Sequence, residues 1–252
     1  MSEATSQART VEGPPGLFSE CVKFLNTSVG SKAAMAASGL LMGGFIIGHM
    51  AGNLAIFGGK DAINAYAHFL QGQPALVWAT RAGLLLSVAL HVFLAVRSHL
   101  IVNAAARPVP YAFKPSAPKH WKKFIAGWSG KYNLWSGLLI FVYLVLHLLQ
   151  FSLRGNKPLT HLLVGTQAIP VVDVHAMMVT AFKCPIVTGF YVLAVVLLAS
   201  HLSHGIYSLC QHLGLWGKTW TPFLQSAAKA LAYGICAAFA SIPLAVLCGF
   251  IQ

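Results

Sequence analysis

The sequence predicts an all-α integral membrane bundle of five transmembrane helices. Hydrophobic residues make up 57% of the 252 positions and charged residues only 9%, whereas soluble domains carry about 25% charged residues. A helix needs about 20 apolar residues to cross a bilayer, and five stretches are long enough. They lie at about 33–57, 76–103, 130–153, 184–212 and 222–250, and are called helices I to V in this section.

The whole chain, 1–252, is expected to form a single membrane domain, because the five spans leave no room for a large soluble domain.

The net charge of +12 does not indicate nucleic-acid binding, since the basic residues lie mainly between the apolar stretches. None of the five acidic residues lies within a span, which disfavours a carboxylate relay of the kind found in proton-coupled carriers. The five cysteines include no CxxC pair, so neither an iron–sulfur cluster nor a zinc site is expected. In helix V, Pro243 is expected to introduce a kink.

Basic residues predict the orientation of the spans. The segment 107–131 between helices II and III holds six lysines and arginines and no acid, and the positive-inside rule places it in the cytoplasm. The N-terminal segment 1–31 is then also cytoplasmic, and the C-terminus lies outside. Three short amphipathic stretches, 17–25, 61–70 and 173–182, are expected to lie along the membrane interface.

Five of the eleven histidines lie well inside apolar helices, where an unpaired imidazole is costly. A lone histidine of this kind is more often hydrogen-bonded to a neighbouring helix than bound to a metal. Here, however, four of the spans contribute at least one, which favours a shared cofactor. The five are His49, His91, His147, His201 and His204.

Depth along the helices sorts these histidines into pairs. At about 1.5 Å of rise per residue, His49 and His147 lie roughly 9 to 12 Å below the outer surface, while His91 and His201 lie roughly 22 to 24 Å below it. Two imidazoles at one depth on two helices are what a bis-histidine haem requires. Copper and zinc are disfavoured because neither pair has a third ligand. The sequence therefore predicts two stacked haems, with His204 as a less well matched rival of His201.

Other residues admit two interpretations each. Arg97 and His99 on the inner part of helix II are candidates for contact with the propionates of the inner haem, although Arg97 is equally compatible with snorkelling to the cytoplasmic interface. Small residues on helix I allow either the packing of a flat macrocycle or close helix packing. These are Gly39, Gly43, Gly44, Gly48 and Gly52.

Over roughly residues 32 to 215 the chain resembles the five-helix dihaem cytochrome b membrane subunits of succinate:quinone oxidoreductases, the succinate dehydrogenases and quinol:fumarate reductases. In that family the fourth ligand precedes a Gly-aliphatic-aromatic stretch by four positions, which selects His201 over His204. The stretches that carry the resemblance are GLLMGGFIIGHMAGN around His49, INAYAHFL after helix I, RAGLLLSVALHVFLAV around His91, ARPVPYAFK after helix II, LVLHLLQF around His147 and SHLSHGIYSLCQHLG around His201.

The resemblance implies the cofactors and partners of respiratory complex II, the succinate-oxidising enzyme of the tricarboxylic acid cycle. Two haem b groups are expected, an outer one on His49 and His147 and an inner one on His91 and His201. A flavoprotein with FAD and an iron–sulfur subunit would bind on the cytoplasmic side of a bacterial inner membrane. Electrons from succinate would pass through the clusters and both haems to a quinone, menaquinone or ubiquinone; fumarate reduction would reverse the flow. A dimer of the whole complex is expected by analogy.

The quinone is expected near the outer haem, with Asn64, His68 and Gln71 as candidate hydrogen-bonding residues. Some fumarate reductases of the family carry a Glu two positions before the fourth ligand, where this chain has Ala199, so a carboxylate-based proton path is doubtful here. Two other functions stay open. One is the cytochrome b subunit of another quinone-linked dehydrogenase, such as a formate dehydrogenase or hydrogenase, and the other is a haem-free membrane scaffold whose histidines bridge helices.

Overall fold

The structure is a computed structural model that describes residues 16–102, 132–153, 155–164, 167–215, 217 and 219–252. The basic segment 107–131 and most of the N-terminal segment, on which the predicted orientation depends, lie outside the described residues. So do the predicted last residue of helix II and the predicted first residues of helix III.

Five of the described helices are long and apolar enough to cross a membrane, which confirms the predicted all-α bundle. Three of them end in a tighter or wider turn: α2 in a 3-10 turn, and α4 and α7 in π turns. The spans are built from α2 (Ser28–Asn53) with η1 (Leu54–Gly58), α4 (Pro74–Arg97) with η2 (Ser98–Val102), α7 (Asn133–His147) with η3 (Leu148–Ser152), α9 (Pro185–His212) and α10 (Trp220–Leu247).

Local sequence explains where several helices begin. The Thr27 side chain accepts a hydrogen bond from the backbone N–H of Gly30 at 2.9 Å and so caps the start of α2. Both α4 and α9 have proline in their first turn, where its missing N–H removes no helical hydrogen bond. Gly59 separates η1 from the following helix. Its φ of 94° is a conformation that residues other than glycine rarely adopt. Pro243 lies inside α10 as expected.

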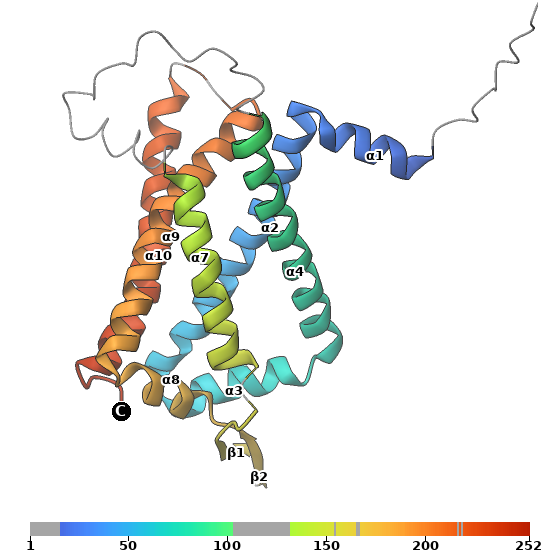
Figure 1. Cartoon of the computed structure of the whole chain (residues 1–252). Coiled ribbons are helices and arrows are strands. Elements are labelled where there is room, and N and C mark those ends of the chain that lie inside the picture. The colour runs from blue at the N-terminus through green and yellow to red at the C-terminus, as the bar shows by residue number, and fades with distance from the viewer. Residues whose placement is uncertain (1–15, 103–131, 154, 165–166, 216, 218) are drawn as a thin grey trace, which may run out of the picture.

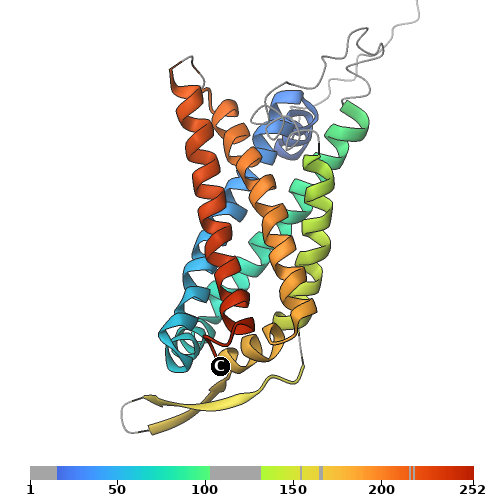
Figure 2. The ribbon, with the colours of Figure 1, turned by 90° about the vertical axis from the view of Figure 1, so that its left-hand side faces the viewer.

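The long helices lie side by side, with α9 packed against both α7 and α10, and α2 packed against α4 and α9 (Figures 1 and 2). Their outer faces carry large apolar side chains such as Leu86, which is 72% exposed. Exposed leucines on a spanning helix are expected to face lipid, because the backbone polar groups are already paired within the helix. The four histidines that form the two pairs predicted from the sequence, by contrast, are only partly exposed.

Three short helices occupy the ends of the bundle: α1 (Leu17–Asn26), α3 (Lys60–Gln71) and α8 (Val174–Phe182). They match the three predicted amphipathic stretches. In Figure 1, α1 lies at one end, while α3, α8 and the C-terminus lie at the other. Most of α8 is buried, including Met178 and Phe182, so it closes this end of the bundle rather than lying on its surface.

A β-hairpin connects α7 to α8 and was not predicted from the sequence. Strands β1 (Leu159–Val164) and β2 (Gln167–Val172) pair antiparallel, with Leu159 opposite Val172 and His161 opposite Pro170. Proline is tolerated in β2 because each strand of a two-stranded ribbon has a free edge. The hairpin projects beyond the helices at the end that holds α3 and α8 (Figure 2).

Candidate functional site

The first candidate site is a pair of histidines from two helices. His49 on α2 and His147 at the end of α7 have ring centroids 5.9 Å apart, with the ring planes at 83° to each other. Phe45 stacks on His49 at 5.2 Å, and Tyr143 stacks on His147 at 5.8 Å. A π turn begins directly after His147, and such turns are frequent at functional sites. We call His49 and His147 the outer pair.

A second pair joins the two remaining histidine-bearing helices. His91 on α4 and His201 on α9 have ring centroids 6.3 Å apart, with an interplanar angle of 63°. Both pairings are those that the depth count assigned from the sequence. We call His91 and His201 the deep pair.

Hydrogen bonds to α2 hold the His91 ring. Its Nδ1 atom lies 3.3 Å from the carbonyl oxygen of Met35 and 3.2 Å from Oγ of Ser38. The Ser38 hydroxyl donates to the same carbonyl oxygen at 2.9 Å. Since Ser38 and His49 are eleven residues apart on α2, the deep pair lies about 16 Å along the helix axis from the outer pair.

The His201 ring is held by α7 in the same way. Its Nδ1 atom lies 3.4 Å from Oγ of Ser136, and its ring hydrogen-bonds to the backbone of Asn133. The Ser136 hydroxyl donates to the Asn133 carbonyl oxygen at 3.0 Å. Each ring of the deep pair is thus held by a serine and by the carbonyl three residues before that serine.

The outer pair has polar neighbours of a different kind. Asn53 Nδ2 donates to the His49 carbonyl oxygen at 2.7 Å and lies 3.3 Å from both ring nitrogens. The buried Tyr191 places its hydroxyl 3.4 Å from Nδ1 of His147 and donates to Oε1 of Gln150 at 2.8 Å. Among the described residues, the hydrogen-bond partners of these two rings are therefore side chains.

The residues predicted near the propionates lie at the α1 end of the bundle. The Arg97 guanidinium donates to Asn26 Oδ1 and to Ser31 Oγ, both at 3.0 Å, and so ties α4 to the start of α2 and the end of α1. Within the described residues its partners are all neutral oxygens. His99 is exposed in η2, and His204 lies half-buried on α9, one turn beyond His201. The ring that faces His91 is that of His201.

The three predicted quinone residues follow one another at spacings of four and three along α3 and so share one face of that helix, but they differ in burial. Asn64 is only 1% exposed, whereas His68 and Gln71 are exposed further along α3. Gln71 lines a shallow depression of about 410 Å³ at the corner between α3 and α4, together with Trp78 and Arg81. Arg81 lies over the Trp78 ring, 5.0 Å from its centroid.

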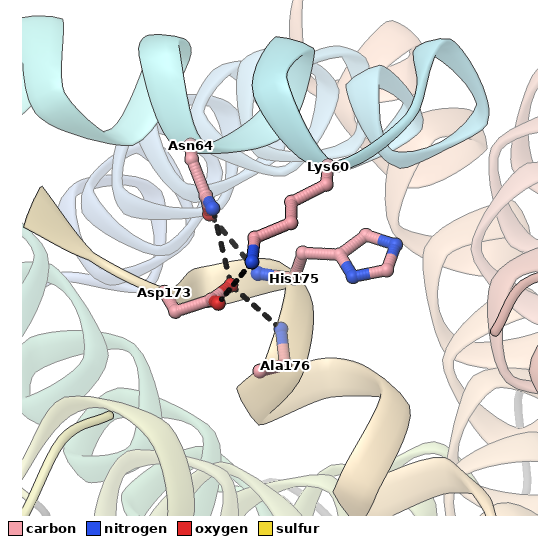
Figure 3. A network of polar contacts seen from close by, with 5 residues as sticks. All are labelled: Lys60, Asn64, Asp173, His175 and Ala176. Atoms are coloured by element: carbon pink, nitrogen blue, oxygen red, sulfur yellow. Dashed lines mark hydrogen bonds and ion pairs between the residues drawn. The ribbon is translucent and has the colours of Figure 1, made fainter. Parts of the chain in front are cut away.

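Asn64 takes part in a buried polar network that joins α3 to α8 (Figure 3). Its Nδ2 donates to Oδ1 of Asp173 at 3.1 Å, and its Oδ1 accepts from the backbone N–H of His175 at 3.1 Å. Asp173 also caps α8 by accepting from the backbone N–H of Ala176 at 2.9 Å. Its second oxygen lies 3.1 Å from Nζ of Lys60. We call this group the α3–α8 network.

Burial raises the pKa of Asp173, but hydrogen bonds outweigh this effect. The Ala176 N–H, the Asn64 amide and the Lys60 ammonium all stabilise the carboxylate, as does the positive charge of Lys60. The pKa of Asp173 therefore lies below its ordinary value. The carboxylate stays charged at neutral pH and holds α3 against α8.

Sequence reasoning missed the residues that support the histidines. Ser38 and Ser136 each begin the segment Ser-Gly-Leu-Leu, and each is followed after eleven residues by a histidine of the outer pair. This repeat, SGLL-x7-H in α2 and α7, is visible in the sequence and could have identified both serines. Tyr191 and Gln150 carry no comparable pattern, because they are joined only through the packing of α9 against the end of α7.

Among the described residues, no three or more His, Cys, Asp or Glu side chains come together in a way that could hold a metal ion. No protein-family model, no curated protein and no solved structure matches the chain. The case for its function therefore depends on the two histidine pairs.

Proposed function

We propose that this chain is the dihaem cytochrome b membrane subunit of a succinate:quinone oxidoreductase, which passes electrons between an iron–sulfur partner and a quinone. The observation that carries the proposal is the presence of two imidazole pairs at two levels of one helical bundle. Each of α2, α4, α7 and α9 contributes one histidine. This distribution over the first four spans favours the succinate:quinone oxidoreductase family over the cytochromes of formate dehydrogenases and hydrogenases.

The donor set fits haem. Haem iron already has four equatorial nitrogens and needs only two axial ligands, whereas copper and zinc need more protein ligands. With a metal–imidazole bond of about 2 Å, two imidazoles would need to lie close together to hold one iron. The observed separations are 5.9 and 6.3 Å. The outer pair would hold one haem and the deep pair the other.

A bound haem supplies an iron that takes up and releases one electron. The chain's own residues orient the ligands. Phe45 and Tyr143 stack on the outer rings, and the serine and carbonyl oxygens beside the deep rings fix how those rings turn. Groups that hydrogen-bond to a metal-binding histidine in this way set its orientation and basicity.

The proposed partners would carry the cofactors for which this chain has no sequence motif. It contains neither a dinucleotide-binding fingerprint nor clustered cysteines, so FAD and iron–sulfur clusters would belong to separate flavoprotein and iron–sulfur subunits. We propose that they bind at the α1 end of the bundle, which would be cytoplasmic in a bacterial inner membrane. Menaquinone or ubiquinone would then react near the outer pair, with the C-terminus outside.

A reduced-minus-oxidised spectrum of the purified chain with haem quantitation tests the cytochrome assignment. We expect a b-type spectrum and two haems per chain. A colourless preparation would overturn the proposal in favour of a haem-free scaffold. Two haems without succinate-dependent reduction in the membranes of the source cell would instead favour the cytochrome of another quinone-linked dehydrogenase.

A further inference from the structure

The SGLL-x7-H repeat places two residues on one face of a helix: a histidine of the outer pair and a serine that contacts a histidine of the deep pair. Eleven residues make about three turns plus 20° and rise about 16 Å, so the serine and the histidine of each repeat share a face at two levels. On α2 the histidine is His49 and the serine, Ser38, contacts His91. On α7 the histidine is His147 and the serine, Ser136, contacts His201. Each helix thus serves both pairs.

The hydroxyl proton of each serine decides which imidazole nitrogen is free. Ser38 donates its proton to the Met35 carbonyl, and Ser136 donates its proton to the Asn133 carbonyl. Each Oγ can then only accept a hydrogen bond from the nearby Nδ1, and a carbonyl oxygen can likewise only accept. At His91 the Met35 carbonyl, 3.3 Å from Nδ1, can only accept and so assigns the ring proton to Nδ1. At His201 the same assignment follows when the Ser136 proton is bonded to the Asn133 carbonyl. The lone pair of Nε2 is left for a ligand.

A glycine follows each serine and leaves room for the ring edge. A Cβ atom added at Gly39 would lie 3.5 Å from Cε1 of His91, which is an ordinary contact. One added at Gly137 would lie 3.2 Å from Cε1 of His201, which is tight. The two glycines are therefore unequal: the ring of His201 rests more closely on α7 than the ring of His91 rests on α2.

We infer that Ser38, Ser136 and Gly137 are positioning residues that hold His91 and His201 as Nε2 ligands of the deep haem. This inference rests on the proposed function. Each serine and its carbonyl partner fix the tautomer and the ring orientation, and Gly137 lets the His201 ring lie close to α7. Loss of groups that hold a metal-binding histidine in this way lowers metal affinity roughly 10- to 100-fold in other metal sites.

The test uses the full-length chain in detergent and follows each haem separately by redox titration, electron paramagnetic resonance and haem transfer to apomyoglobin. Ser38→Ala and Ser136→Ala should shift the midpoint potential and the low-spin signal of one haem only. They should also speed the transfer of that haem to apomyoglobin roughly tenfold or more. Gly137→Ala should have a larger effect than Gly39→Ala. Ser136→Thr, which keeps the hydroxyl, should restore most of the parent behaviour.

Two controls match these variants. Ser241 donates its hydroxyl proton in the same way to the carbonyl three residues earlier, that of Ala238, but makes no hydrogen bond to a histidine within the described part of the chain. Ser241→Ala should therefore leave both haems unchanged. Gly234 on α10 has no neighbouring atom within 4 Å of an added Cβ, so Gly234→Ala should do the same. The second haem reports in every sample that the variant is folded.

Two haems in the parent, with the serine variants behaving as the Ser241→Ala control does, would overturn the inference and leave the proposed function standing. An equal shift of both haems in Ser136→Ala would also overturn it. Absence of haem from the parent would overturn the proposed function and the inference together.

Discussion

His91 and His201 come from helices α4 and α9 and lie with their ring centroids 6.3 Å apart, each ring resting on a different third helix. The His91 ring contacts α2 and the His201 ring contacts α7. This arrangement explains how two rings are held in a bundle whose spanning helices are mostly exposed toward lipid. The helices that carry the outer pair also support the deep pair.

Tyr191→Phe should alter the outer site alone. The change removes the hydroxyl that lies 3.4 Å from Nδ1 of His147 and donates to Gln150. We expect the potential of one haem to shift while the other stays constant, and the free energy of unfolding to fall by about 1 kcal/mol. Redox titration and thermal unfolding measure the two effects. Tyr233→Phe is the matched control on α10, where the ring is 49% exposed; equal effects of both variants would contradict the assignment.

Asn64→Ala should destabilise the end of the bundle that holds α3 and α8. It leaves an Asp173 oxygen and the backbone N–H of His175 without a side-chain partner in a buried setting. The expected cost is about 1 to 3 kcal/mol, seen as a lower midpoint of thermal unfolding in detergent. Asp61→Asn, an exposed change on the same helix, should leave the midpoint unchanged. A normal midpoint in Asn64→Ala, with weaker quinone binding, would instead favour direct contact with quinone.

The contribution of Asp173 to the stability of the folded protein should be lost as the pH falls. Because the pKa of Asp173 is lower in the folded protein than in the unfolded chain, its contribution is complete above the unfolded pKa of about 3.9. It is lost as the pH falls through the lower, folded value. The difference in unfolding temperature between the parent and Asp173→Asn should stay constant from about pH 8 to 5 and shrink below about pH 4. A difference that grew as the pH fell would contradict the α3–α8 network.

Cysteine labelling tests the orientation. Cys21 on α1 and Cys248 after α10 are both exposed and lie toward opposite ends of the bundle. Variants that retain only Cys21 or only Cys248 should differ in how far a membrane-impermeant maleimide labels them in intact spheroplasts. We expect Cys248 to react and Cys21 to react only after lysis. The reverse order would place the N-terminus outside and move the proposed partners to the other end.

Regular geometry made part of this structure predictable. Hydropathy located five spans, and a constant rise per residue paired His49 with His147 and His91 with His201 before any contact was known. The amphipathic stretches likewise became helices α1, α3 and α8.

What the sequence did not predict depends on packing between distant residues. The hydrogen bond from the Asn64 amide to Asp173, for example, joins residues 109 positions apart in the chain. The hairpin does not follow from the sequence because its short apolar strands, LTHLLV and QAIPVV, have no strong period. Ser38 and Ser136 were missed although their repeat is visible, because a helical serine usually bonds its own backbone.

Haem quantitation in four single variants tests the central claim most directly. His49→Ala and His147→Ala should each remove or perturb one spectral component, and His91→Ala and His201→Ala should each affect the other. His204→Ala, one turn from His201, is the matched control and should retain both haems. Two components lost in these pairs would support two bis-histidine haems at two levels. Full haem content in all four variants, or no haem in the parent, would contradict the account and leave the histidines as helix-bridging residues.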